Sequence, residues 1–203
     1  VPAWCPTASD GTASIRTSVR NVDGVLMRVL GIDPGLTRCG VSVVEGALGR
    51  QPRLVAVGVI TTSARLETPA RLLEIEQQLE AWVVEYSPEV VAVERVFSDQ
   101  NVLSVIGTAQ AAGIGMLVGA RHGLGVHTHT PTEVKAAITG SGRADKAQVG
   151  AMVARILKLS EPPRPADAAD AAALAICHLW RSGGQARIEA AAARQLARQA
   201  GRA

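Results

Sequence analysis

The sequence predicts an α/β protein with a mixed five-stranded sheet and helices on both faces. Apolar runs joined by short turns form a strand meander over residues 29–60, and elements in the order helix–strand–helix–strand–helices follow it. The run Val90–Val93 is apolar at every position, which is typical of a strand covered on both faces. The 203 residues are enough for one domain with a full core.

The individual elements follow from periodicity and breakers. Strands are predicted at 29–32, 41–44 and 54–60, and a helix from Glu67 to Tyr86, which Pro88 ends. A Gly/Ala-rich helix at 101–121 lies between the strands 90–93 and 126–128, and its small and polar residues favour a buried or interface helix over a membrane span. A capping box at Thr130 opens a short helix, and two more are predicted at 144–159 and 167–181.

Composition indicates a soluble globular protein, with 47% hydrophobic and 19% charged residues. The net charge of +3 slightly favours an anionic partner. The cysteines Cys5, Cys39 and Cys177 form no metal or disulfide pattern, which favours a reducing cytoplasm. Residues 1–26 are expected to be a disordered N-terminal extension, 27–184 the folded domain, and the Arg-rich residues 185–203 a flexible basic tail.

Four carboxylates stand at the ends of apolar elements. Asp33 ends the first strand and Glu94 ends the strand 90–93, so neighbouring parallel strands would place both at one edge of the sheet. Asp167 and Asp170 are three residues apart at the start of the last helix and would share one face. Taken singly, each has a structural explanation as a turn, ion-pair or helix-start residue.

If the four acids converge, their repulsion must be offset, and divalent cations such as Mg²⁺ do this through carboxylate oxygens. Histidine offers no competing site in the sequence. His127 and His129 lie on one strand face with no third ligand expected nearby, so both are interpreted as ordinary surface or half-buried residues.

Four segments resemble the RuvC family of Holliday-junction resolvases: GIDPGLTRCG (31–40), VAVERVF (91–97), TPTEVKAAITGSGRADKAQV (130–149) and PADAADAAALAI (165–176). The resemblance implies a ribonuclease H-like nuclease domain, a cytoplasmic homodimer, Mg²⁺ dependence with Mn²⁺ as a possible substitute, and paired symmetric nicks in four-way DNA junctions during recombination and repair. A branch-migration motor complex is a possible further partner.

The resemblance also implies roles for particular residues. Asp33, Glu94, Asp167 and Asp170 match the family's metal-binding catalytic acids, which would support hydrolysis through two metal ions roughly 3.5–4 Å apart. The residues expected to contact DNA are Phe97, which would either stack on junction bases or belong to the core, and the basic residues Lys135, Lys146 and Arg143.

Three functions other than junction resolution remain as alternatives. They are a YqgF-like ribonuclease H-type nuclease, an actin-like ATP phosphotransferase and a non-catalytic DNA-binding module. A dimer is expected to form through the helix 101–121, where Gly107, Ala111, Gly115 and Gly119 make one smooth stripe. The same stripe would also suit packing of this helix on the protein's own sheet.

Overall fold

The computed structural model describes residues 26–47, 49–96 and 102–200. The sheet has the strand order β3-β2-β1-β4-β5, in which β1 pairs antiparallel with β2 and parallel with β4. The strands are β1 Met27–Asp33, β2 Arg38–Gly46, β3 Arg53–Thr61, β4 Val90–Glu94 and β5 Gly125–His129. The helices are α1 Thr68–Tyr86, α2 Val102–Arg121, α3 Pro131–Thr139, α4 Lys146–Leu157 and α5 Ala166–Ala200.

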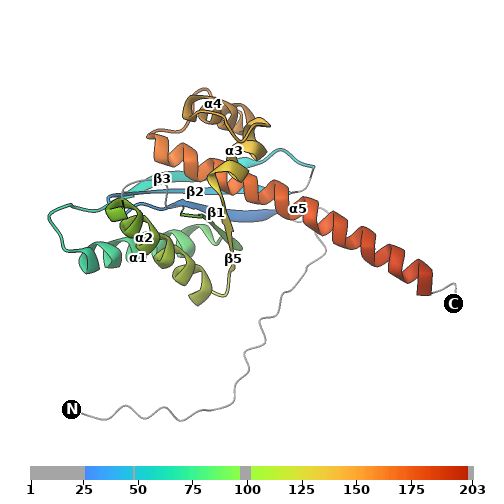
Figure 1. The fold of residues 1–203 in the computed structure, drawn as a ribbon, viewed down its shortest axis with the longest axis horizontal. Coiled ribbons are helices and arrows are strands. Elements are labelled where there is room, and N and C mark those ends of the chain that lie inside the picture. Colours follow the sequence, from blue (N-terminus) through green and yellow to red (C-terminus); the bar gives the residue numbers. More distant parts are fainter. Residues whose placement is uncertain (1–25, 48, 97–101, 201–203) are drawn as a thin grey trace, which may run out of the picture.

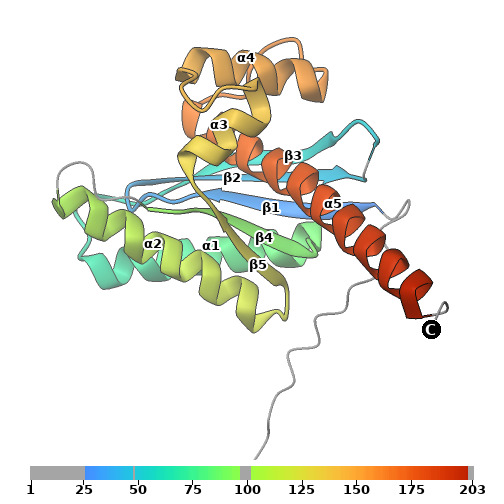
Figure 2. The same ribbon diagram turned by 45° about the vertical axis from the view of Figure 1, so that its right-hand side comes forward.

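Helices cover both faces of this mixed sheet, which confirms the predicted fold class. Helices α1 and α2 lie on one face, and α5 lies across the other (Figure 1). Helices α3 and α4 stack outside the first half of α5 (Figure 2). The central strand β1 is buried from both sides, since Val29, Leu30 and Ile32 are at most 1% exposed. This double burial explains why its sequence is apolar without alternation.

Two glycines allow α5 to lie directly on the centre of the sheet. A Cβ atom at Gly31 of β1 would be 2.2 Å from the backbone oxygen of Ala171. A Cβ atom at Gly40 of β2 would be 2.1 Å from the backbone oxygen of Asp167. Because only glycine permits such close approach, these two positions fix the start of α5 against β1 and β2.

Two predicted helix boundaries were wrong. Helix α4 begins at Lys146, not at residue 144, because Asp145 forms a capping box with Gln148; it ends at Leu157, where Lys158 adopts a left-handed conformation. Helix α5 passes its predicted end near Arg181 and reaches Ala200, because the Ala-, Arg- and Gln-rich sequence contains strong helix formers and no proline. The predicted division into 1–26, 27–184 and 185–203 otherwise stays a prediction.

The small-residue stripe of α2 faces the protein's own sheet, which is the second of the two arrangements expected from the sequence, so the stripe itself is not available for a dimer contact. A Cβ atom at Gly115 would lie 3.0 Å from Ile32, and one at Gly119 would lie 2.8 Å from Val126. The small side chains bring α2 close to the sheet, and the opposite surface of the helix is left exposed. Among the residues that the structure describes, no helix is long and apolar enough to cross a membrane.

Candidate active site

Asp33 and Glu94 lie side by side at one edge of the sheet, as predicted. Asp33 is the last residue of β1 and Glu94 the last residue of β4. The two strands are parallel and in register, with Ile32 opposite Val93. Both carboxylates therefore leave the sheet at the same edge, each held by a buried strand.

Asp167 and Asp170 reach this edge from the first turns of α5. The close contact at Gly40 places the backbone of Asp167 against β2, and Pro165 directly precedes the helix, where its backbone oxygen accepts a hydrogen bond from the Ala168 backbone nitrogen at 2.9 Å. Their spacing puts both aspartates on one side of the helix. The four predicted acids thus come from three elements to one place.

Electrostatics shows how close the four acids are. The pKa of Asp33 is raised from 3.8 to about 8, first by burial and then by the negative charges of Glu94, Asp170 and Asp167. Burial, and after it the charge of Asp170, also raises the pKa of Glu94. Burial and the neighbouring carboxylates therefore disfavour a negative charge on Asp33, which keeps a proton at neutral pH.

Two cations sit on the α5 acids. Lys146, the first residue of α4, donates to Asp170 at 3.0 Å, and this hydrogen bond raises the lysine pKa. Arg38, the first residue of β2, donates through Nε to Asp167 at 2.6 Å. Arg38 was not identified from the sequence, although it lies within the segment GIDPGLTRCG, because its partner is far away in the chain.

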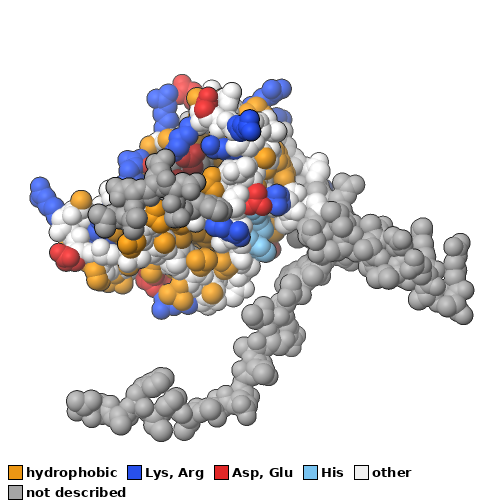
Figure 3. All heavy atoms as spheres, viewed as in Figure 1, with side chains coloured by type: hydrophobic (Ala, Val, Ile, Leu, Met, Phe, Trp, Pro, Cys, Tyr) orange, Lys and Arg blue, Asp and Glu red, His pale blue; other side chains and the backbone are white. Residues whose placement is uncertain are grey.

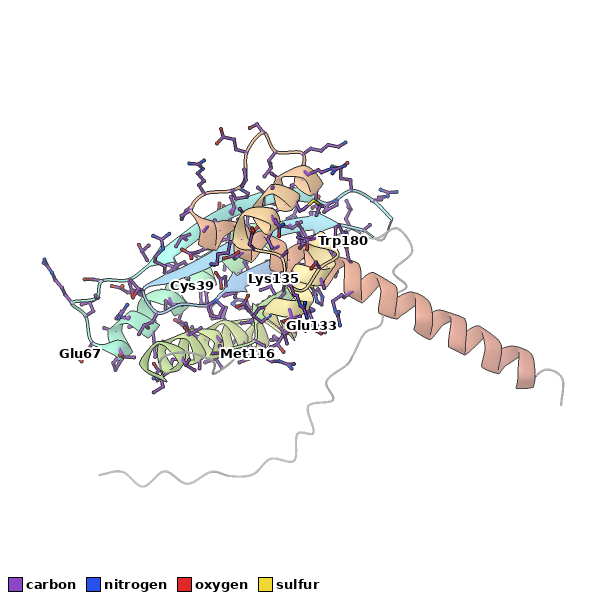
Figure 4. The ribbon with its side chains drawn as sticks, turned by 45° about the horizontal axis from the view of Figure 1, so that its top comes forward. Cys39, Glu67, Met116, Glu133, Lys135 and Trp180 are labelled. Carbon is purple, nitrogen blue, oxygen red and sulfur yellow. The ribbon has the colours of Figure 1, made fainter. Side chains whose placement is uncertain are left out.

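Of the other residues predicted to contact DNA, the two that the structure describes make no hydrogen bond or ion pair to the four acids. Lys135 lies on α3 (Figure 4), and its charge acts on Glu94, so it belongs to the surroundings of the acids. Arg143 is exposed in the loop between α3 and α4, and its backbone nitrogen donates to Ser141. Phe97 lies outside the described residues, and the DNA-binding role of all four residues stays a prediction.

A third histidine, His178, lies beside the two that the sequence singled out, but the described residues include no group of three or more His, Cys, Asp or Glu side chains arranged to hold a metal ion. His129 Nε2 and His178 Nδ1 are 3.1 Å apart, and the rings of His127 and His178 pack with centroids 4.6 Å apart. Burial lowers the pKa of His178 to about 3, and the two neighbouring imidazoles lower it too. Packed rings with one mutual hydrogen bond indicate a structural cluster, in which His178 is neutral.

The chemistry of the four acids suits hard divalent cations. All the donors are carboxylate oxygens, which Mg²⁺ and Mn²⁺ prefer, and a cation would relieve the repulsion that raises the pKa of Asp33. As they stand, no three or more His, Cys, Asp or Glu side chains in the described ranges are arranged to hold one ion. Arg38 and Lys146 engage two of the carboxylates instead.

Comparisons with known proteins agree with this site. The family model for crossover junction endodeoxyribonuclease RuvC matches residues 29–178, a span that includes all four acids. The RuvC endonuclease of Cutibacterium acnes is 64% identical over 173 residues, covering 85% of this chain and 88% of the relative. That of Thermobifida fusca is 65% identical over 162 residues, covering 80% and 89%.

Solved structures give the same result. Thermus thermophilus RuvC in complex with a Holliday junction substrate superposes with a TM-score of 0.75 at 33% identity, covering 79% of this chain and 97% of that one. The yeast mitochondrial Holliday junction resolvase, at 15% identity, shares the fold with a TM-score of 0.60. These likenesses confirm the ribonuclease H-like fold. The chain belongs to the RuvC family of crossover junction endodeoxyribonucleases.

Proposed function

We propose that this protein resolves four-way DNA junctions by paired nicks, using divalent cations held by Asp33, Glu94, Asp167 and Asp170. The observation that carries the proposal is the convergence of these acids from β1, β4 and α5, with charge effects linking each to Asp33. The three alternatives lose support because the RuvC family match spans all four acids.

Each residue group has a distinct task in this reaction. The four acids would hold Mg²⁺, with Mn²⁺ as a substitute; when bound, the metal supplies Lewis-acid chemistry at the scissile phosphodiester. Asp33 gives up its proton when its carboxylate becomes a ligand. Lys146 and Lys135, which lie close to the acids, bind DNA phosphates as point charges.

The proposed homodimer brings two such sites to one junction, and the exposed surface of α2 is the interface that we assign. Ile106 and Leu117 are 49% and 46% exposed, and a Cβ atom at Gly113 would meet nothing within 4 Å. Together with Gln110, these residues recur at the spacing of one helix face. Figure 3 shows hydrophobic side chains gathered over α2, and Met116 on this helix is labelled in Figure 4.

The proposed junction cutting also bears on the location of the protein and on a further partner. Junction cutting takes place on cellular DNA, and the buried free thiols of Cys39 and Cys177 are consistent with the expected cytoplasmic location. A branch-migration motor that moves the junction would bring cleavable sequences to the two active sites. Such a motor is therefore a proposed partner of this protein.

A nicking assay tests the proposed function. The protein is incubated with Mg²⁺ and an end-labelled four-way junction, with linear duplex of the same sequence, EDTA and ATP as controls. We expect nicks at symmetric positions in two opposed strands, no cutting of linear duplex, none in EDTA, and no ATP requirement. An uncut junction, or equal cutting of the linear duplex, would contradict the proposal.

A further inference from the structure

Arg38 is a basic residue beside the acids that the proposed function leaves without a role. Its Nε donates to Asp167 Oδ2 at 2.6 Å, and its side chain is 48% exposed while that of Asp167 is 27% exposed. The arginine side chain is therefore the more exposed member of the pair. A DNA phosphate that approaches Asp167 from solvent can reach this cation.

The backbone beneath Arg38 is held firmly. Thr62 donates through its backbone nitrogen to Thr37 at 3.2 Å and through its hydroxyl to Leu36 at 2.6 Å. Arg71 of α1 donates to the hydroxyls of Thr62 and Thr37, at 2.8 and 2.7 Å. With the turn braced in this way, Arg38 can change its partner only by moving its side chain.

We propose that Arg38 neutralises Asp167 in the metal-free protein and transfers to a DNA backbone phosphate when a divalent cation takes over that carboxylate. The inference rests on the proposed function, since it assigns a metal ligand role to Asp167. A cation on Asp167 repels the guanidinium, and an exposed arginine–carboxylate pair is weak enough to be displaced. The planar guanidinium then offers parallel N–H donors that match phosphate oxygens.

The arrangement of the other groups supports this exchange. Lys146 sits on Asp170 as Arg38 sits on Asp167, so both α5 acids carry a basic partner. Within the described part of the chain, no three acidic, His or Cys side chains are placed to hold one ion. Arg38 and Lys146 must leave these carboxylates before the carboxylates can bind metal. Both basic side chains then lie beside the place where the substrate phosphate is expected.

Metal binding without DNA is the first test. Arg38→Gln removes the competing cation, so Mn²⁺ should bind the DNA-free protein roughly two- to fivefold more tightly, as measured by electron paramagnetic resonance of free Mn²⁺. Arg53→Gln is the matched control. It removes the same charge and breaks another exposed pair, Arg53–Glu45 at 3.0 Å, and should leave Mn²⁺ affinity unchanged.

Junction binding is the second test. The affinity for a labelled four-way junction is measured by anisotropy against salt concentration, once in EDTA and once in Ca²⁺. In EDTA, the slope of log affinity against log salt for Arg38→Gln should match that of wild type, because Arg38 is then engaged with Asp167 and contacts no phosphate. In Ca²⁺ the slope of log affinity against log salt should fall by about 0.9, the value for one lost phosphate contact. Arg38→Lys keeps the charge and should restore most of that slope.

Specific results would overturn the exchange. They are a Mn²⁺ affinity of Arg38→Gln equal to or weaker than that of Arg53→Gln, or a salt slope in Ca²⁺ equal to that of wild type. Nicking by the wild-type protein is scored separately. If wild type fails to nick junctions while Arg38→Gln still shifts both Mn²⁺ affinity and the Ca²⁺-dependent slope, the proposed function fails and the exchange stands.

Discussion

Asp33→Asn is expected to stabilise the metal-free protein, by an amount that grows with pH. Burial and three neighbouring carboxylates raise the pKa of Asp33 from 3.8 to about 8. Between these two values the folded protein keeps a proton that the unfolded chain releases, so wild-type stability falls as pH rises through that window. Asparagine has no such proton to lose.

The pKa shift sets an upper limit on the gain. One pKa unit corresponds to about 1.4 kcal/mol, so the cost of Asp33 reaches up to about 4 kcal/mol at pH 7 and is complete above pH 8. Small movements of the neighbouring acids away from a charged Asp33 would reduce this cost. Even about 1 kcal/mol changes the melting temperature of a chain of this size by about 2–4 °C.

The assay is thermal unfolding in EDTA at pH values from 4 to 8, repeated in Mg²⁺. The melting temperature of Asp33→Asn should equal that of wild type near pH 4 and exceed it increasingly toward pH 8. Mg²⁺ should raise the melting temperature of wild type more than that of the variant, because a ligand has been removed. A difference that does not depend on pH, or a less stable variant at pH 8 in EDTA, would refute the reasoning.

Glu45→Gln is the matched control for this experiment. Hydrogen bonds from Arg28 and Arg53 lower the pKa of Glu45, so the stability it contributes is present above its ordinary pKa of 4.5 and is lost as pH falls below it. This variant should be less stable than wild type at neutral pH. Its difference from wild type should not change between pH 6 and 8.

Three further changes test the site, the interface and the packing. Asp170→Asn should abolish nicking yet keep junction binding in EDTA, by gel shift, because it removes a negative charge near the DNA; near-normal nicking would exclude Asp170 from the site. Leu117→Glu should shift the protein to monomer in sedimentation, whereas the exposed Val84→Glu on α1 should not, and a dimeric Leu117 variant would contradict the assigned interface. Gly40→Ala places a Cβ 2.1 Å from a backbone oxygen of α5 and should lower the free energy of unfolding, measured by chemical denaturation, by about 1–3 kcal/mol. Gly184→Ala, where a Cβ meets nothing within 4 Å, should raise it by about 0.5–1 kcal/mol. Equal effects of the two alanines would contradict the packing argument.

The sequence predicted the positions of the acids because each follows or opens an element whose own pattern is clear. Asp33 and Glu94 end buried strands, and the order of the strands made a common edge the expected result. The partner of Arg38 could not be predicted, because Asp167 lies 129 residues later and only the packing of α5 on β2 brings them together. Likewise His178, 49 residues after His129, shows no local pattern that marks it as a neighbour.

The α2 stripe left two packing partners open for a different physical reason. Small residues at every fourth position permit close approach of any surface, and the sequence does not say which surface approaches. In the structure Gly115 contacts Ile32 and Val93 of the sheet, so the large apolar residues on the other side of the helix carry the information about a partner. An exposed Leu117 is therefore better evidence for an interface than a buried glycine.

Three of the four acids are compensated in the site without metal, and this connects the fold to the proposed reaction. Asp33 keeps a proton, Asp167 pairs with Arg38, and Asp170 pairs with Lys146. Under the proposed function, metal binding would therefore release one proton and two basic side chains. The proton leaves more readily as pH rises toward 8, so metal affinity should rise over the same range. Under the same proposal the released side chains, which belong to β2 and α4, are compensated by a DNA phosphate. Metal and junction are accordingly expected to bind with positive cooperativity, each tightening the other by the same factor. Measuring Mn²⁺ affinity with and without a non-cleavable junction tests this, and equal affinities would contradict it.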